Sequence, residues 1–517
     1  MTLSDYVRAI ITATVYDVAV RTPLDKAEKL SARFGNDIRL KREDLQPVFS
    51  FKLRGAYNKI SQLSDEQKAK GIICASAGNH AQGVAYSANR LKINNLIVMP
   101  KTTPDIKVQA VKAFGGTVHL HGDSFDEANR FAIEKSQKDG MTYIAPYDDT
   151  LVIAGQGTVA LELSQDWREM EYVFVPVGGG GLVAGIASFL GEVAPHVKVI
   201  AVESEGSACL KVALKDGKRT RLPQVGLFAD GVAVAQIGQI LFNIANLTKS
   251  NGQGKVIDDV ITCSNDEICA SVKDIFEENR HIVEPSGALA LAGLKKYVQQ
   301  HNLTGKNCVA IVSGANMNFD RLRYIAERTE IGENKEAIFA VQIPEETGAF
   351  LNFCRSLQGR NITEFNYRAK SPSSPKSGQL ASIFVGIGLK DGQQERHIIK
   401  NKLATDGYLA HDLTDDEVAK THIRYLIGGH ANIAHEKIFR VMFPERPGAL
   451  LNFLEKLGQD FNITLFHYRN HGAAEGRILA GLQATPTSGR KIMDALNEIG
   501  YACEQINDNA GYELFLK

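Results

Sequence analysis

Short apolar runs and amphipathic stretches alternate between residues 71 and 315 of the chain. The apolar runs have the length of buried strands and occupy residues 72–75, 95–100, 117–122, 142–146, 172–177, 198–204 and 308–314. The intervening stretches have helical spacing, at residues 81–91, 105–114, 125–137, 157–167 and 182–193. This order is typical of βαβ units with a parallel sheet. It predicts two α/β lobes with a cleft between them.

The remainder of the chain contains one pattern twice, at residues 339–368 and 439–469. In both copies Pro-x-x-x-Gly-Ala precedes an amphipathic helix, and Asn-Ile-Thr opens a strand that ends in Tyr-Arg. A second strand, a helix and a final strand follow. The order βαββαβ predicts a ferredoxin-like module, present twice. The Ser- and Pro-rich segment 370–377 reads as an exposed hairpin loop of the first copy. A duplicated module of this kind suggests sensing of a small ligand, or assembly.

The charged stretch 328–336 ends the βαβ pattern and predicts a linker. The predicted organisation is a catalytic domain, 1–327, with a small lobe inserted at about 55–150, a linker, 328–336, a first regulatory domain, 337–414, a connector, 415–435, and a second regulatory domain, 436–517.

Composition narrows the classes of partner. The chain has 59 Lys and Arg against 59 Asp and Glu, which gives no electrostatic reason to expect nucleic acid or an anionic membrane as a partner. Its seven cysteines form no C-x-x-C pair, which favours a reducing cytoplasm over a disulfide framework or a zinc site. The N-terminus lacks the basic region of a secretory signal. Residues 172–191 are uncharged, but six glycines and Pro176 divide them into a strand, a loop and a helix, so we expect no membrane span.

Lys52 lies between Phe51 and Leu53, at the start of a predicted helix. Lysines often pass apolar neighbours with the ammonium in water, and that is one interpretation. The other is a desolvated amine, because burial disfavours the charged form and leaves a nucleophile able to form a Schiff base.

Two glycine-containing loops follow predicted strands. In SAGNHAQG (76–83), small residues let backbone N–H groups approach an anion, although a capped turn is an equal alternative. In residues 178–181 four glycines precede a helix and could cradle a phosphate. Gly179, Gly181 and Ala184 also match a dinucleotide fingerprint, with Glu203 near the position of its ribose-binding acid. That alternative explains neither Lys52 nor Asn79, whereas a phosphorylated aldehyde cofactor, pyridoxal phosphate, fits all of these residues.

Ser313 follows the predicted strand 308–312 and could be a helix cap. If it faces a pyridine nitrogen, its neutral hydroxyl leaves that nitrogen largely unprotonated and the ring a weaker electron sink. Such a site favours loss of a β-substituent over transamination.

At this point the chain resembles the biosynthetic threonine ammonia-lyases of the tryptophan-synthase-β-like (fold type II) group, over essentially its whole length. The resemblance is carried by SFKLRGAYN (50–58), SAGNHAQG (76–83), GGGGL (178–182), ADGVAV (229–234), EPSGALALAG (284–293) and SGANMNFDRLRYIAER (313–328). It implies a two-lobed α/β fold with parallel sheets, followed by two α+β ferredoxin-like domains of the ACT type.

The resemblance also implies roles for individual residues. Lys52 carries the cofactor as a Schiff base, and Ser76 joins it as a catalytic residue. The cofactor-binding residues are Lys52, Asn79, Gly178, Gly179, Gly180, Gly181, Leu182 and Ser313; the substrate carboxylate is held by Ser76, Ala77 and Gly78. We expect Tyr367 and Tyr468, at equivalent strand ends, to lie at effector sites, although they could simply end the strands.

One departure concerns metals. Related racemases bind a divalent cation through a Glu and an Asp six residues apart, whereas this chain has Glu203 and Cys209. We therefore expect no required divalent metal, and a monovalent cation stays open. His119 and His121 alternate on one strand without a third ligand, which indicates a structural role.

The resulting hypothesis is pyridoxal-phosphate-dependent deamination of L-threonine, and more slowly of L-serine, to a 2-oxo acid and ammonia at the entry to isoleucine synthesis. Isoleucine and valine are the implied effectors, and a homotetramer is the implied assembly. The alternatives are another fold type II enzyme (serine dehydratase, racemase or threonine synthase) or a sensor without activity.

Overall fold

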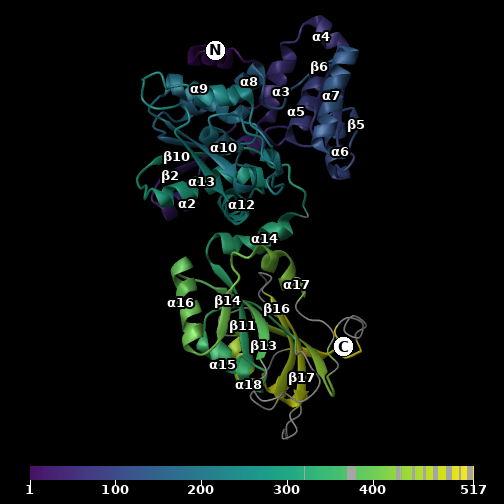
Figure 1. Cartoon of the computed structure of the whole chain (residues 1–517), viewed down its shortest axis with the longest axis vertical. Coiled ribbons are helices and arrows are strands. Elements are labelled where there is room, and N and C mark those ends of the chain that lie inside the picture. Colours follow the sequence, from purple (N-terminus) through teal and green to yellow (C-terminus); the bar gives the residue numbers. More distant parts are fainter. Residues whose placement is uncertain are drawn as a thin grey trace. The chain divides into compact units, whose positions relative to one another are not determined.

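The computed structural model describes residues 1–319, 321–368, 380–426, 431, 433–444, 449–457, 461–469, 475–484, 492–499, 502–508 and 516. The loop predicted at 370–377 lies outside the described residues. The chain divides into two compact units, Met1–Gly332 and Glu333–Lys517, and each is described by itself (Figure 1).

The larger sheet of the first unit has six strands in the order β1-β2-β10-β7-β8-β9, and only β1 runs antiparallel to its neighbour. The strands are β1 (Leu24–Lys26), β2 (Asp37–Arg42), β10 (Asn307–Val312), β7 (Tyr172–Pro176), β8 (Lys198–Ser204) and β9 (Asp259–Cys263). Since β10 lies between β2 and β7, the end of the predicted βαβ region returns to the middle of the sheet. The carboxyl end of β10 therefore lies beside that of β7, where the glycine loop begins.

A second sheet of four parallel strands belongs to the small lobe, in the order β5-β4-β3-β6. Its strands are β5 (Val118–Leu120), β4 (Asn95–Met99), β3 (Ile72–Ala75) and β6 (Thr142–Tyr143). Residues of β3 and β4 are buried among the apolar faces of the surrounding helices. The predicted pair of α/β lobes with parallel sheets is confirmed.

Side-chain caps fix where several helices begin. Ser64, Ser124 and Ser264 each form a capping box, and Asp149 accepts hydrogen bonds from the first amides of α8. The helices of this unit are α1 (Leu3–Ile11), α2 (Glu28–Phe34), α3 (Lys52–Ser61), α4 (Asp65–Lys70), α5 (Asn79–Leu91), α6 (Asp105–Ala113), α7 (Phe125–Asp139), α8 (Thr150–Asp166), α9 (Gly181–Val193), α10 (Cys209–Asp216), α11 (Gln239–Ala245), α12 (Asn265–Asn279), α13 (Pro285–Gln300) and α14 (Arg321–Gly332). Residues 172–191 divide into β7, a glycine loop and α9, and no helix within the described residues combines the length and apolar character needed to cross a membrane.

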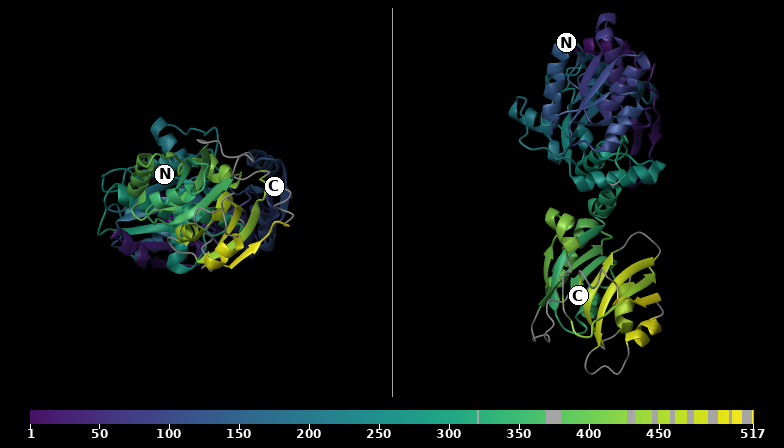
Figure 2. Two further views of the ribbon diagram at one scale, coloured as in Figure 1. Left: turned by 90° about the horizontal axis from the view of Figure 1, so that it is seen from below. Right: turned by 90° about the vertical axis from the view of Figure 1, so that its right-hand side faces the viewer.

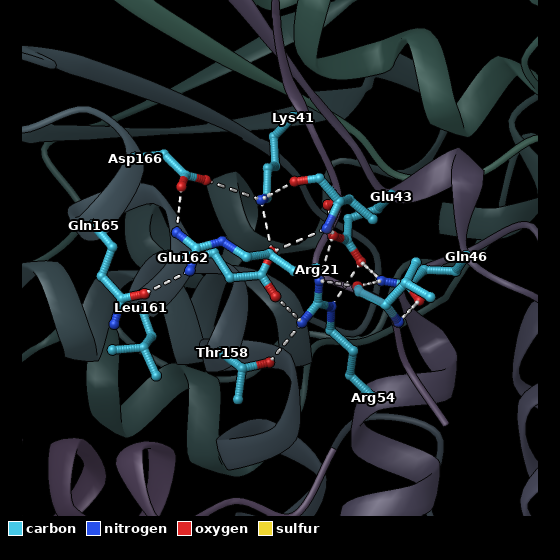
Figure 3. Close-up of polar contacts among 12 residues, drawn as sticks. Arg21, Lys41, Glu43, Gln46, Arg54, Thr158, Leu161, Glu162, Gln165 and Asp166 are labelled. Carbon is cyan, nitrogen blue, oxygen red and sulfur yellow. Dashed lines mark hydrogen bonds and ion pairs between the residues drawn. The ribbon is translucent and has the colours of Figure 1, made fainter. Parts of the chain in front are cut away.

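A buried cluster of charges holds α3 in place (Figure 3). The guanidinium of Arg54 makes paired hydrogen bonds to the carboxylate of Glu43, at 2.8 and 2.7 Å. It also donates to Glu162 Oε1 on α8, at 2.6 Å, and to Thr158 Oγ1, at 3.1 Å. Its last N–H points to the carbonyl of Val20, at 3.4 Å. All five guanidinium donors therefore have acceptors.

Lys41 completes the charge balance of this cluster. Its ammonium lies 2.6 Å from Glu162 Oε2 and donates to the carbonyl of Thr22, at 2.7 Å. Lys41, Glu43, Arg54 and Glu162 are almost fully buried, so two cations oppose two carboxylates away from water. Buried charges are tolerated when they are paired and hydrogen-bonded in this way.

The second unit is built on one antiparallel sheet of eight strands, in the order β14-β11-β13-β12-β16-β17-β15-β18. Its strands run from green to yellow in the right-hand view of Figure 2. The strands are β11 (Glu336–Pro344), β12 (Ile362–Arg368), β13 (Leu380–Gly388), β14 (Leu409–Asp412), β15 (Lys437–Pro444), β16 (Phe461–Arg469), β17 (Glu475–Ala484) and β18 (Ala502–Gln505). Helices α15 (Ala349–Ser356) and α16 (Gly392–Thr405) belong to the first module, and α18 (Ala449–Leu457) and α19 (Ile492–Ile499) to the second. Both modules follow the predicted βαββαβ order, and β12 pairs with β16 to join them.

Two predicted connections contain helix. Residues 328–332, placed in the linker, form the last turn of α14, and β11 begins at residue 336. Residues 419–426, placed in the connector, form a π-helical turn and the short α17 (Arg424–Leu426). The domain boundaries themselves stay predictions.

Arg54→Leu is expected to destabilise the first unit by about 3–5 kcal/mol, because it leaves Glu43 and Glu162 buried with too little positive charge. Urea unfolding followed by the fluorescence of Trp167, the chain's only tryptophan, measures this. The control is Arg21→Leu, whose half-exposed side chain pairs with Asp166 and whose loss should cost no more than about 1 kcal/mol. Equal losses in the two variants would contradict the role of the cluster.

Candidate active site

Lys52 is the first residue of α3, and its side chain lines a pocket between the two sheets of the first unit. Its Nζ donates to the carbonyl of Pro146, at 2.9 Å. Burial lowers the pKa of Lys52 to about 8, although the nearby carboxyl of Glu284 acts in the opposite direction. Lys52 is half-buried and its amine is hydrogen-bonded inside the pocket, which supports a partly desolvated amine over a fully solvated one.

Residues 177–180 connect β7 to α9, which begins at Gly181, and residues 178–182 line the same pocket. Gly180 has φ +98°, in the left-handed region that favours glycine. A Cβ on Gly179 would lie 2.2 Å from the ring of Tyr147, so a side chain has no room there. The loop leads into the N-terminus of α9, where backbone N–H groups and the helix dipole favour an anion. These residues fit the phosphate of the predicted cofactor.

Asn79 and Ser313 line this pocket as well. Asn79 is the first residue of α5, and its amide makes hydrogen bonds to Glu284 and Asn316. Ser313 follows β10 and is 4% exposed. Its hydroxyl donates to the carbonyl of Ser286, at 3.1 Å. The structure thus brings Lys52, Asn79, the glycine loop and Ser313 into the lining of one pocket from four separate segments; their roles there stay predictions.

The other predicted loop, residues 76–78, connects β3 to α5 but is not part of the lining of this pocket. Its residues are partly buried, and the hydroxyl of Ser76 accepts a hydrogen bond from the amide of Gly78, at 3.3 Å. The catalytic role of Ser76 and the substrate contacts of Ala77 and Gly78 stay predictions.

Glu284 is a pocket residue to which the sequence reasoning gave no role, although the motif EPSGALALAG contains it. It is 3% exposed and precedes Pro285 at the start of α13. Burial raises the pKa of Glu284 to about 7, and the charge of Asp230 acts in the same direction. A carboxyl and an amine with shifted pKa values in one pocket are typical of a reactive site. A glutamate directly before the Pro of a helix start was the available signal.

Glu203 lies outside this pocket. Its carboxylate accepts hydrogen bonds from the backbone N–H groups of Leu210, at 2.7 Å, and Lys211, at 2.9 Å, in the first turn of α10. Burial raises the pKa of Glu203 to about 7. Because both oxygens are used by the helix, the carboxylate serves as a cap, and the geometry disfavours the dinucleotide alternative.

The residues considered for metal binding have other contacts. The thiol of Cys209 donates to the carbonyl of Val234, at 2.8 Å. His119 and His121 stack on Phe131 of α7, with ring centroids 4.9 and 4.1 Å away. In the part of the chain that the structure describes, no three His, Cys, Asp or Glu side chains are grouped to hold a metal ion.

The two predicted effector tyrosines lie on the strands that join the modules. Tyr367 of β12 is opposite Phe466, and Tyr468 of β16 is opposite Phe365. Both tyrosines are buried, and the hydroxyl of Tyr367 donates to Glu345 Oε1, at 3.2 Å. Their role in effector binding stays a prediction.

Comparison with known proteins identifies the family of both units. A family model described as pyridoxal-phosphate dependent enzyme matches residues 15–314. A second, described as the C-terminal regulatory domain of threonine dehydratase, matches residues 327–423 and 427–516.

Whole-chain relatives agree with these matches. The biosynthetic L-threonine dehydratase of Salmonella typhimurium is 52% identical, over 99% of this chain and 97% of the relative. The mitochondrial threonine dehydratase of Saccharomyces cerevisiae is 46% identical, over 99% and 89%. The solved structure of processed threonine deaminase isoform 2 from Solanum lycopersicum is 48% identical and covers 64% of this chain and 88% of its own, with a TM-score of 0.61. The chain therefore belongs to the family of pyridoxal-phosphate-dependent enzymes and, within it, to the biosynthetic threonine dehydratases.

Proposed function

We propose that the chain deaminates L-threonine to 2-oxobutanoate and ammonia, with L-serine as a slower substrate. The observation that carries the proposal is the partly desolvated amine of Lys52, which shares one pocket with a glycine cup at a helix N-terminus and with the hydroxyl of Ser313. Pyridoxal 5′-phosphate, when bound, supplies the electron sink for the electron pair left on the substrate's α-carbon.

Each residue contributes a separate step. Lys52 would hold the cofactor at its aldehyde, and its free amine would take the α-proton of threonine. The amides of residues 178–182 would hold the phosphate, and Asn79 would donate to the cofactor's 3′-oxygen. Residues 76–78 hold the substrate carboxylate, with Ser76 assisting protonation of the departing β-hydroxyl. Ser313 would face the ring nitrogen with a neutral hydroxyl, which would favour loss of the β-hydroxyl over transamination.

The competing activities yield different products. Formation of 2-oxobutanoate from L-threonine supports the proposal. Formation of a D-amino acid would identify a racemase, and phosphate release from a phosphorylated substrate would identify a threonine synthase. Turnover of L-serine ahead of L-threonine would identify a serine dehydratase. A purified chain that absorbs no visible light and turns over none of these substrates would be a sensor.

Borohydride reduction of the native protein is expected to fix the cofactor on Lys52, so peptide mass mapping finds the pyridoxyl group on the peptide that contains this residue. The other lysine peptides of the same digest are the control.

Lys52→Ala should lower turnover of threonine on the order of 10³-fold or more, because one group is lost as nucleophile and as base. Turnover within about tenfold of the native value would exclude the assignment.

Ser313→Asp should slow the elimination and favour an amino-transfer side reaction, because a carboxylate partner protonates the ring nitrogen and strengthens the electron sink. Ser313→Ala is the matched variant and should keep the cofactor with a much smaller loss of turnover. Product analysis with threonine as substrate separates keto acid formation from amino transfer. Identical behaviour of the two variants would remove Ser313 as the ring partner.

The second unit is proposed to bind isoleucine as inhibitor and valine as its antagonist, in a cytoplasmic homotetramer. The support is the match of this unit to the regulatory domain of threonine dehydratase and its duplicated module. Allosteric coupling typically changes apparent affinity roughly 5- to 150-fold.

Isoleucine is expected to shift the threonine saturation curve of the full chain to higher concentration. Tyr367→Phe, which loses the hydrogen bond to Glu345, and Tyr468→Phe should each weaken this shift while turnover without effector stays nearly unchanged. Tyr408→Phe is the control, since Tyr408 is not part of β12 or β16, the strands that join the modules, and its ring packs edge-on against Phe353. A hyperbolic curve that isoleucine leaves in place would rule out feedback control even with the lyase activity intact.

A further inference from the structure

The side-chain amide of Asn79 is held at both ends. Its Nδ2 donates to Glu284 Oε1, at 2.6 Å, and its Oδ1 accepts from Asn316 Nδ2, at 2.7 Å. The carbonyl of Val48 can only accept, so the Asn316 atom that faces it is Nδ2, and the Asn79 atom that accepts from the same Nδ2 is Oδ1. The Nδ2 of Asn79 carries two hydrogens, and one of them remains for a further acceptor in the pocket.

Glu284 is itself immobilised. Its Oε1 also accepts from the hydroxyl of Ser286, at 2.8 Å, and its backbone amide donates to the carbonyl of Gly314, at 3.2 Å. A Cβ on Gly314 would lie 2.6 Å from Oε1, so the carboxylate packs directly on the loop that follows Ser313. Charged groups that act on it include Asp230, which disfavours ionisation, and Lys107, which favours it; the charge of Lys52, in the same pocket, also interacts with it.

Asn316 connects the amide to the segment before Lys52. Its Nδ2 donates also to the carbonyl of Val48, at 2.9 Å. Two further backbone hydrogen bonds join the same segments, from Ala315 to Phe49, at 2.9 Å, and from Phe51 to Ser313, at 3.2 Å. Both partners of Asn79 are thus held by the segments around Ser313, the predicted ring-nitrogen contact, and before Lys52.

We propose that Glu284 and Asn316 are positioning residues that clamp the Asn79 amide, so that one N–H of Nδ2 is presented to the cofactor. The clamp also joins α5 of the small lobe to α13 and to the loop after β10. The inference rests on the proposed function for the identity of the cofactor, and it adds two residues that act through Asn79.

The test is a double-mutant cycle on cofactor affinity in the full chain. Cofactor-free protein is titrated with pyridoxal 5′-phosphate, and the Kd is compared for native protein, Asn79→Ala, Glu284→Ala and the double variant. Each single substitution should weaken binding roughly tenfold to a hundredfold, as expected for a hydrogen bond with a charged partner. If Glu284 acts through Asn79, the Kd of the double variant should equal, within about threefold, the Kd of whichever single variant binds the cofactor less tightly.

Two further measurements separate positioning from a general loss of structure. Glu284→Gln keeps an oxygen acceptor for Nδ2 and should restore the Kd to within about fivefold of the native value, whereas Glu284→Ala does not. The visible absorbance band of the bound cofactor should move in the same way in Asn79→Ala and Glu284→Ala, because both lose the same oriented N–H. A general structural defect would lower the unfolding temperature but would not shift the absorbance band in the same way in both variants.

Asn316→Ala, in the same cycle with Asn79→Ala, provides an independent second arm if Glu284→Ala does not fold. If the two single-variant increases in Kd multiply in the double variant, in either cycle, the clamp is overturned. If the native protein nevertheless binds pyridoxal 5′-phosphate and forms 2-oxobutanoate, the proposed function still holds. If the native protein binds no cofactor, both the clamp and the proposed function are wrong.

Discussion

The buried guanidinium of Arg54 is the contact on which the geometry of the pocket depends. Its five N–H groups reach Glu43 in the turn after β2, Glu162 and Thr158 on α8, and the carbonyl of Val20 in the N-terminal segment. A cation in this setting must keep every partner, because an unpaired buried charge is far more costly than a missing apolar contact. Helix α3 therefore has one position among these elements. Lys52 opens the same helix two residues earlier, so the placement of the amine follows from the placement of the guanidinium.

Burial acts on the pocket in two opposite directions. It disfavours the ammonium form of Lys52 and the carboxylate form of Glu284, and so brings both pKa values towards neutrality. The amides at the start of α9 provide the complementary feature, a fixed positive potential for an anion. The combination separates a site for phosphate from a site for a neutral amine, which is what chemistry on an amino acid at a phosphorylated aldehyde requires.

The walls of the pocket come from both lobes, and polar contacts cross between them. Asn79 of α5 reaches Glu284 of the large lobe, and Lys107 of α6 lies 2.6 Å from Asp230, next to the pocket residues Gly231 and Val232. In the second unit the link between modules is also polar and buried, since Arg368 of β12 pairs with Glu436, at 2.5 Å. The pairing of β12 with β16 makes the two modules one sheet.

Local patterns in the sequence indicated many of the elements and which single residues to consider for chemistry. Apolar runs and helical spacing predict β3 to β8, β10 and helices α5 to α9, and the repeat predicts both modules, because each of these elements is decided by neighbours within a few residues; β1, β2 and β9 were not predicted. Lys52, Asn79, residues 178–182 and Ser313 stand in motifs whose local geometry suits a cofactor. Only the tertiary structure decided that Arg54 and Glu284 matter, since their partners lie up to 205 residues away and no local pattern reports such a contact. The same limit applies to burial: whether an amine or a carboxyl is desolvated depends on elements that reach it from elsewhere in the chain.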